Sequence, residues 1–416
     1  MNSDMQLKDY NAAHQYICKF TDYERLIHYH STRRIFNLKR MKALISASGN
    51  PQDKLKLIHI AGTKGKGSTA IFLSQLLQSA GYKVGLFTSP HLVDLRERIQ
   101  INQKLIPKKA FVNTLNSLLG NIKRIKPTFF EITTAMAFHY FTKEKVDYAV
   151  IEVGLGGRLD ATNIIKPLMS IITRIDFDHM DILGNTLTKI AREKAGVIKE
   201  KTPVITIVQQ PEAMRIIRNY AGMKKAPLSI IPKSKMTGKK LPRQIPGKHQ
   251  EENLMLALAA CEKLNIPIGS INSAFRNITL PGRIETISRN PFIIADVSHN
   301  YVSIKALADT VKKEFRYEKL ILILGIARDK EVDKILRLIL PIADVIIFTK
   351  SDNPRLLEPM EFIDHIKDLD LHVPVFLEPN CRKALETAKS IATQKDLILI
   401  AGSFSLAGAL YPTIKK

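Results

Sequence analysis

The stretch from Leu57 to Thr69 constrains the fold of this chain more than any other. An apolar run, Leu57–Ala61, ends in Gly62, and two further glycines flank Lys66. An amphipathic segment follows and ends at Gly81. This pattern predicts a strand, a tight loop and a helix, in which glycines let backbone N–H groups converge on a phosphate. The helix N-terminus and the Lys66 ammonium would add positive charge, so we predict a phosphate-binding loop.

The stretch departs from the usual P-loop pattern in two places. That pattern has a glycine five residues before its second glycine and Ser or Thr directly after the lysine. Ile60 and Gly67 occupy those positions here. A purely structural turn is the alternative. The strand before the loop, the helix after it and the lysine inside it favour binding of nucleotide phosphates.

The bulk properties indicate a globular protein of more than one domain. The length of 416 residues is enough for two or three domains, and the hydrophobic content of 45% is ordinary. We expect a cytoplasmic protein without a membrane partner, because no apolar run is long enough to span a bilayer and Met1–Gln6 lacks a signal-peptide pattern. Cys18, Cys261 and Cys381 lie far apart without metal-ligand spacing, so we expect reduced thiols.

The formal net charge of +24 is unusual for a globular protein. A solvated lysine-rich surface explains most of it, and attraction of small acidic ligands is the main functional alternative. The sequence contains no arginine stripe interleaved with aromatic residues and no zinc-finger pattern. We therefore expect small anionic partners and no nucleic acid.

Acidic residues follow two further apolar runs. Glu152 lies near the end of the run Asp147–Val153, just before a glycine-rich loop, and Asp176-Phe177-Asp178-His179 follows the run Met169–Thr173. Oxygen donors at strand ends favour Mg²⁺, whereas the lack of a nearby cysteine or paired histidine disfavours zinc. The alternative for Glu152 is a buried salt bridge.

The pattern changes to regular β–α alternation near residue 290, which predicts a parallel, doubly wound sheet. We therefore expect an N-terminal domain over residues 1–287, with a helical segment over 1–50, and a second domain over 288–416. A linker is expected at 284–291. The polar stretch 221–247 is predicted to be a loop or a small hairpin.

Together these motifs resemble the folylpolyglutamate synthases of the Mur ligase superfamily, which in bacteria often also act as dihydrofolate synthases. The resemblance runs through most of the chain, and it is carried by Gly62–Ser68, Ser89–Leu92, Thr128–Glu131, Glu152–Asn163, Asp178-His179, Arg192–Gly196, Pro281–Arg283 and Asp296–Asn300. The implied fold is α/β, with a P-loop NTPase-like Mur ligase central domain and a smaller C-terminal Rossmann-like domain.

The resemblance also implies site residues. The catalytic residues would be Lys66, Lys194 and His299. ATP would be bound by Thr63, Lys64, Gly65, Lys66, Gly67, Ser68, Asn253, Arg283, Asp296 and His299, with Asn253 facing the adenine and His299 the γ-phosphate. Ser89 and Glu152 would ligate one Mg²⁺ and His179 a second. Lys194 would be carbamylated. The folate pocket would be lined by Thr128, Phe129, Phe130, Glu131, Leu159, Asp160 and Ala161.

Some positions depart from the pattern of the family. Lys64 stands where Asn is frequent, and Ser298 where Ala is frequent. Arg33-Arg34-Ile35 lacks an acidic residue expected of enzymes that use dihydropteroate, whereas Glu152–Asp160 resembles the bifunctional bacterial type. The acceptor thus stays open between folates and dihydropteroate.

The resemblance implies ATP-dependent ligation of L-glutamate through an acyl phosphate, with release of ADP and phosphate, by a monomer. Three alternatives remain. A Mur-type ligase acting on a peptidoglycan precursor is disfavoured by Ser89–Leu92. A guanine-nucleotide module is suggested only by Thr349–Asp352, which has Thr where Asn is required. A nucleic-acid-stimulated ATPase would require stimulation by DNA or RNA.

Overall fold

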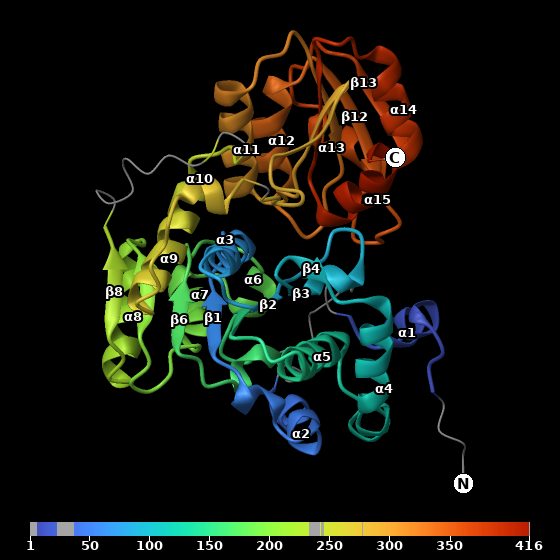
Figure 1. The fold of residues 1–416 in the computed structure, drawn as a ribbon. Coiled ribbons are helices and arrows are strands. Elements are labelled where there is room, and N and C mark those ends of the chain that lie inside the picture. The colour runs from blue at the N-terminus through green and yellow to red at the C-terminus, as the bar shows by residue number, and fades with distance from the viewer. Residues whose placement is uncertain (1–5, 23–36, 233–241, 243–244, 277, 416) are drawn as a thin grey trace. The chain divides into compact units, whose positions relative to one another are not determined.

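The computed structural model describes residues 6–22, 37–232, 242, 245–276 and 278–415, which form two compact units (Figure 1). The first unit ends at Ile278, and the main part of the second begins at Thr279. Each unit has its own sheet and its own hydrophobic core. The predicted α/β class is therefore confirmed in both parts of the chain.

The first unit contains a sheet of eight strands in the order β4-β3-β2-β5-β1-β6-β7-β8. The strands are β1 (Leu57–Ala61), β2 (Val84–Phe87), β3 (Ile99–Ile101), β4 (Lys104–Leu105), β5 (Tyr148–Glu152), β6 (Met169–Ile172), β7 (Val204–Ile207) and β8 (Leu228–Ile231). β1 pairs in parallel with β5 on one side and β6 on the other. The loop after β1 thus lies where the strand order reverses, which is where open α/β sheets bind ligands.

Helices cover both faces of this sheet. The helices of this unit are α1 (Tyr10–Ile17), α2 (Lys39–Ala47), α3 (Lys66–Ser79), α4 (Lys108–Ile125), α5 (Phe129–Lys143), α6 (Met180–Leu183), α7 (Leu187–Ala195), α8 (Pro211–Met223), α9 (His249–Lys263) and α10 (Ile271–Ala274). Leu57 and Ile151 share a core with α4 and α5, and Ala61 and Ile172 share one with α7 and α8. α3 packs against β1, β2 and β5 as well. The central strands are buried throughout, because helices cover both of their faces.

The second unit is a six-stranded sheet in the order β13-β12-β11-β14-β10-β9. Its elements are β9 (Glu285–Arg289), β10 (Phe292–Ala295), α11 (Tyr301–Glu314), β11 (Leu320–Leu324), α12 (Val332–Ile339), β12 (Val345–Lys350), α13 (Phe362–Ile366), β13 (Val375–Asn380), α14 (Cys381–Ile391), β14 (Leu397–Ala401) and α15 (Phe404–Ile414). One face carries α11 and α12, and the other carries α14 and α15. The predicted doubly wound arrangement is confirmed.

Two sequence predictions about connections are wrong. The expected linker at 284–291 contains β9, which pairs antiparallel with β10 and forms an edge of the second sheet. Residues 221–231, expected to be a loop or hairpin, contain the end of α8 and the parallel strand β8. The predicted division between residues 287 and 288 falls within β9 and stays a prediction. The Arg33-Arg34-Ile35 segment lies outside the described residues.

Within the described ranges, no helix combines the length and apolar character required to cross a bilayer.

Candidate active site

The predicted phosphate loop lies between β1 and α3, and two of its glycines are required by their surroundings. A Cβ at Gly62 would lie 1.8 Å from the Thr173 hydroxyl, and one at Gly65 would lie 2.0 Å from Asn253 Oδ1. Both glycines have positive φ, +150° and +85°. Lys66 begins α3, so the free N–H groups of its first turn face the loop. The strand, loop and helix arrangement is confirmed.

The segment after β6 holds this loop in place. The Thr63 and Lys64 amides donate to the Arg174 carbonyl at 2.8 and 3.1 Å. The Thr63 hydroxyl donates to the Asp176 carbonyl and accepts from the Asp176 amide, each at 3.0 Å. The loop is therefore preorganised by the carboxyl end of the neighbouring strand.

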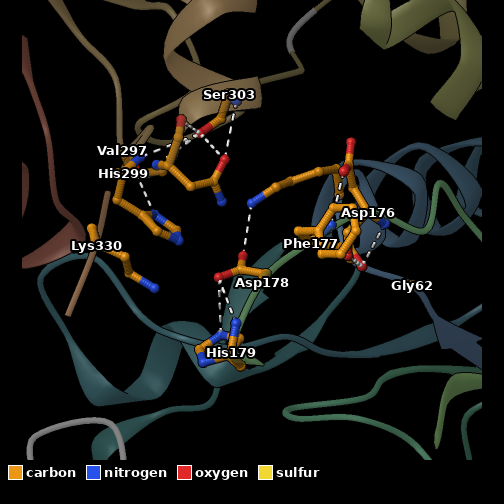
Figure 2. Close-up of polar contacts among 12 residues, drawn as sticks. Gly62, Asp176, Phe177, Asp178, His179, Val297, His299, Ser303 and Lys330 are labelled. Atoms are coloured by element: carbon orange, nitrogen blue, oxygen red, sulfur yellow. Dashed lines mark hydrogen bonds and ion pairs between the residues drawn. The ribbon is translucent and has the colours of Figure 1, made fainter. Parts of the chain in front are cut away.

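An ion pair links the phosphate loop to the acidic segment that follows β6 (Figure 2). Lys64 Nζ lies 2.8 Å from Asp178 Oδ2, and only 9% of the Asp178 side chain is exposed. The His179 amide donates to Asp178 Oδ1 at 3.0 Å, and His179, with φ +49°, is the N-cap residue of α6. The sequence indicated that Asp178 could bind a cation, but it gave no signal that Lys64 pairs with it.

Glu152 ends β5, Ser89 follows the adjacent strand β2, and the structure brings the two residues together. Glu152 Oε2 accepts the Ser89 amide at 3.0 Å, and both residues are buried. Glu152 also lies beside Ile60 in the strand register, close to the start of the phosphate loop. A buried carboxylate at this position suits Mg²⁺, which prefers oxygen ligands and keeps several waters.

No cluster of three or more His, Cys, Asp or Glu side chains suited to a metal occurs in the described part of the chain. Glu152 supplies one buried carboxylate at the end of β5. Mg²⁺ is usually held by one or two carboxylates, with water and substrate phosphates completing the octahedron. The residues present therefore fit a cation that is bound together with a nucleotide.

Lys194 lies on α7 and is 4% exposed. Its Nζ donates to the Gly62 carbonyl at 2.8 Å, which places it against the phosphate loop. Burial, together with the positive charges of Lys66 and Lys64, lowers the pKa of Lys194 well below its usual value. A larger fraction of this amine is thus neutral, and only a neutral amine can add to CO₂.

The glycine-rich loop after β5 is folded around the Asp160 carboxylate. This side chain accepts the Leu155 amide at 2.8 Å, the Thr162 amide at 3.0 Å and the Thr162 hydroxyl at 2.6 Å. Asp160 also caps the short 3-10 helix η4 (Ala161–Ile164). Burial raises the pKa of Asp160, and the hydrogen bonds and Lys66 oppose this shift. Leu159 and Ala161 flank Asp160 in the sequence.

Thr128 and Glu131 form a capping box at the start of α5. The Thr128 hydroxyl accepts the Glu131 amide at 3.2 Å, and Glu131 Oε2 accepts the Thr128 amide at 2.7 Å. Glu131 also pairs with Arg40 at 3.0 Å. The two residues therefore have a structural role, whereas a contact with folate stays a prediction.

Phe129 and Phe130, which lie between Thr128 and Glu131, are close to other candidate elements of the site. The guanidinium of the fully buried Arg98 lies 5.1 Å from the centre of the Phe129 ring. A Cβ at Gly154 would lie 2.5 Å from the Phe130 ring, so this side chain packs against the glycine-rich loop. Phe130 therefore connects the two segments that were predicted to line a folate pocket.

In the second unit, three predicted nucleotide residues lie around the carboxyl end of β10. Asp296 is buried and accepts the Ile284 and Ser298 amides, both at 2.8 Å. His299 Nδ1 lies 2.9 Å from the Val297 carbonyl (Figure 2). The Arg283 guanidinium lies 5.7 Å from the Phe404 ring centre. The ring centre of Phe404 also lies 6.3 Å from that of His299. No pattern in the sequence pointed to Phe404.

Asn253 lies against the phosphate loop. Its Oδ1 is the atom that a Cβ at Gly65 would strike, and it is 3.5 Å from the Thr69 hydroxyl. Its Nδ2 donates to Gln250 at 2.9 Å. The structure thus brings Asn253 to the start of α3, while its predicted contact with adenine stays untested.

Comparison with known proteins identifies two family models in this chain. The Mur ligase middle domain matches residues 60–231, and the domain described as "Mur ligase, glutamate ligase domain" matches residues 282–404. Both matches agree with the fold described above.

Individual relatives match most of the chain. The Bacillus subtilis protein named dihydrofolate synthase/folylpolyglutamate synthase is 36% identical over 351 residues, 76% of this chain and 82% of that protein. The structure of Mycobacterium tuberculosis folylpolyglutamate synthase complexed with ADP has a TM-score of 0.87 at 29% identity, covering 98% of both chains. The structure of Escherichia coli FolC in complex with DHPP and ADP has a TM-score of 0.83 at 26% identity, covering 97% of both chains. The chain belongs to the folylpolyglutamate synthase/dihydrofolate synthase family, within the Mur ligases.

Proposed function

We propose that this protein joins the α-amine of L-glutamate to a carboxylate of a folate-type acceptor, with conversion of ATP to ADP and phosphate. One observation carries the proposal. At one edge of a parallel sheet, the phosphate loop with Lys66 lies next to the buried Glu152–Ser89 pair and the buried Lys194. This arrangement suits transfer of a phosphoryl group, and the relatives of the chain are ligases that form folates.

The chemistry follows from the resistance of a carboxylate to attack by an amine. An acceptor carboxylate oxygen attacks the γ-phosphorus of ATP, the bond to ADP breaks, and an acyl phosphate forms. The glutamate amine then attacks the acyl carbon, loses a proton and expels phosphate. Lys66 and the N–H groups at the start of α3 stabilise the negative charge on the phosphoryl oxygens. His299 is proposed to contact the γ-phosphate, and Arg283 and Asp296 the nucleotide.

Two Mg²⁺ ions are proposed, one held by Ser89 and Glu152 and the other by His179. When bound, they supply positive charge to the phosphate oxygens and so stabilise the transition state. We also propose that Lys194 adds CO₂ at Nζ and releases a proton. The resulting carbamate would replace a buried amine with an anion, which suits a position close to bound cations.

The acceptor is proposed to include both a reduced folate and dihydropteroate. The Bacillus subtilis relative has both activities in its name, and Escherichia coli FolC is seen with DHPP and ADP. The segment Gly154–Asn163 is the proposed contact for the pteridine end, together with Thr128–Glu131. We further propose that the enzyme acts as a cytoplasmic monomer without nucleic acid.

The direct test is ADP release by the purified protein with ATP and Mg²⁺. Turnover should require both L-glutamate and an acceptor, and dihydropteroate and tetrahydrofolate should be assayed separately. Three further assays test the alternative functions. They use a uridine-linked peptide as the acceptor, GTP in place of ATP, and added DNA or RNA. Rapid ADP release with neither acceptor nor glutamate would refute the proposal.

A Lys66→Ala variant supplies the control for the phosphate loop. Its kcat should fall by roughly 10²–10³-fold, because an oriented charge on the transferring group is lost. Its melting temperature should stay close to that of the parent chain, since Lys66 is partly exposed at a helix start. Normal activity in this variant would exclude the assigned role of the loop.

A further inference from the structure

A buried polar row runs from the central strand to the glycine-rich loop. His59 lies in the middle of β1, is fully buried, and shares a sheet face with Leu57 and Ala61. Its Nε2 lies 2.8 Å from the hydroxyl of Thr162, which is also fully buried. That hydroxyl lies 2.6 Å from Asp160 Oδ1. The row thus connects the strand that leads into the phosphate loop with the loop proposed to contact the pteridine.

The protons of this row are determined by counting donors. The Thr162 hydroxyl has one proton, and an ionised Asp160 can only accept it. His59 Nε2 must then carry a proton and donate it to Thr162. In that arrangement Nδ1 is a bare acceptor, and His59 Nδ1 is indeed buried with no hydrogen-bond partner among the described residues.

The reverse arrangement of protons is less favourable, because it leaves a buried N–H group without an acceptor. If Asp160 were protonated, it would donate to Thr162, which would donate to His59 Nε2. Nδ1 would then carry a buried N–H without an acceptor, and buried orphan N–H groups are rarer than unsatisfied acceptors. A neutral imidazole fits both arrangements, and burial lowers the pKa of His59 to about 3. The surroundings of Nδ1 therefore favour the arrangement with an ionised Asp160.

We propose that His59 is a positioning residue: its Nε2–H directs the Thr162 hydroxyl toward Asp160 and so holds Asp160 as the anionic anchor of the glycine-rich loop. The anchor receives the Leu155 amide near the start of the loop and the Thr162 amide near its end. The conformation of Leu159–Ala161 between them depends on this carboxylate. The predicted effect on the acceptor rests on the proposed function, whereas the tautomer of His59 does not.

The first test is the tautomer of His59 in the substrate-free protein. Long-range ¹H–¹⁵N correlation spectra of histidine-labelled protein at neutral pH identify the protonated nitrogen, and loss of the signals in His59→Gln assigns them. We expect a pyrrole-like Nε2 and a pyridine-like Nδ1. A proton on Nδ1 would overturn the proposal, whether or not the enzyme ligates glutamate.

The second test separates positioning from packing. His59→Leu and Thr162→Val remove the donor and the hydroxyl, whereas His59→Gln and Thr162→Ser retain them. The first pair should raise KM for the acceptor about tenfold, as expected for a lost hydrogen bond in a charged network, with KM for ATP within about twofold of the parent. The conservative pair should restore most of the affinity for the acceptor.

A matched control uses His139 on α5, a partly buried histidine whose Nε2 also lacks a partner among the described residues. His139→Leu should leave both KM values within about twofold of the parent, because this side chain has no link to Asp160. Equal effects of His59→Leu on both KM values, or no advantage of His59→Gln over His59→Leu, would overturn the proposal. The melting temperature of each variant shows whether it is folded.

Discussion

Lys64, Lys66 and Lys194 act on one another through charge at the phosphate loop, and their environments differ. Lys64 is paired with Asp178, whereas Lys194 is buried against the Gly62 carbonyl. The lowered pKa of Lys194 is caused first by burial and then by the charge of Lys66, with a smaller contribution from Lys64. A lysine in this environment is available for addition of CO₂ at a pH where an exposed lysine is not.

This difference predicts how a neighbouring substitution affects carbamylation. Lys64→Asn removes a positive charge and should raise the pKa of Lys194, so less of the amine is neutral at a given pH. The carbamate signal in ¹³C NMR with labelled bicarbonate should therefore titrate in at higher pH than in the parent. Lys194→Arg should show no such signal, and a persistent signal in that variant would assign the carbamate to another amine.

His59 predicts a defined sensitivity to acid. Its pKa is about 3 in the folded chain and 6.5 as the reference for the unfolded chain. Between these values the unfolded state binds a proton that the folded state does not, so stability falls as pH drops below about 6.5. From pH 7 to pH 5 the parent should lose about 2 kcal/mol of unfolding free energy more than His59→Gln. Urea denaturation at both pH values measures this difference, and equal losses would contradict it.

At the level of elements, the capping box of α5 connects stability with the proposed folate contact. Thr128→Ala should cost about 1 kcal/mol in unfolding free energy, the usual effect of a lost N-cap. It should also raise KM for the acceptor, because Phe129 and Phe130 follow directly. Ser270→Ala, which removes the cap of α10, is the matched control. It should change stability to a similar extent and leave KM unchanged. The same change in KM for both variants would indicate a general effect of instability.

The elements that the sequence predicted well are those with a strong local signal. β1, the phosphate loop and α3 follow from an apolar run, three glycines and an amphipathic stretch, and the alternation after residue 290 determines the second sheet. β9 was missed because its residues are only partly buried at a sheet edge, so the strand lacks the continuous apolar run of its neighbours. β8 was missed for the same reason.

The residues of the candidate site also differ in whether they carry a local signal in the sequence. Glu152 at a strand end and the lysine of the phosphate loop could be identified from local sequence. The Lys64–Asp178 pair, the Arg283–Phe404 contact and the His59–Thr162–Asp160 row join residues far apart in the chain. Tertiary pairing of this kind has no local signature, although a histidine within an apolar central strand is a signal that could have drawn attention to His59.

For the whole molecule, the net charge of +24 predicts a dependence on ionic strength. ATP, folates and glutamate are all anionic, so the positive field of the protein should increase their local concentration. Raising NaCl from 50 to 500 mM shortens the Debye length to a few ångströms. KM for ATP and for the acceptor should rise about three- to tenfold, while kcat should change little. Constant KM values would indicate that the lysines only solubilise the surface, and choline chloride controls for a specific effect of Na⁺.

In the proposed mechanism, ATP activates the acceptor by transferring a phosphoryl group to its carboxylate. An acceptor labelled with ¹⁸O at both oxygens of that carboxylate, turned over with ATP and L-glutamate, reports on this step. Each amide bond formed should transfer one ¹⁸O into the released phosphate, while the other stays in the amide carbonyl. Phosphate free of label, with amide formation undiminished, would exclude an acyl phosphate intermediate.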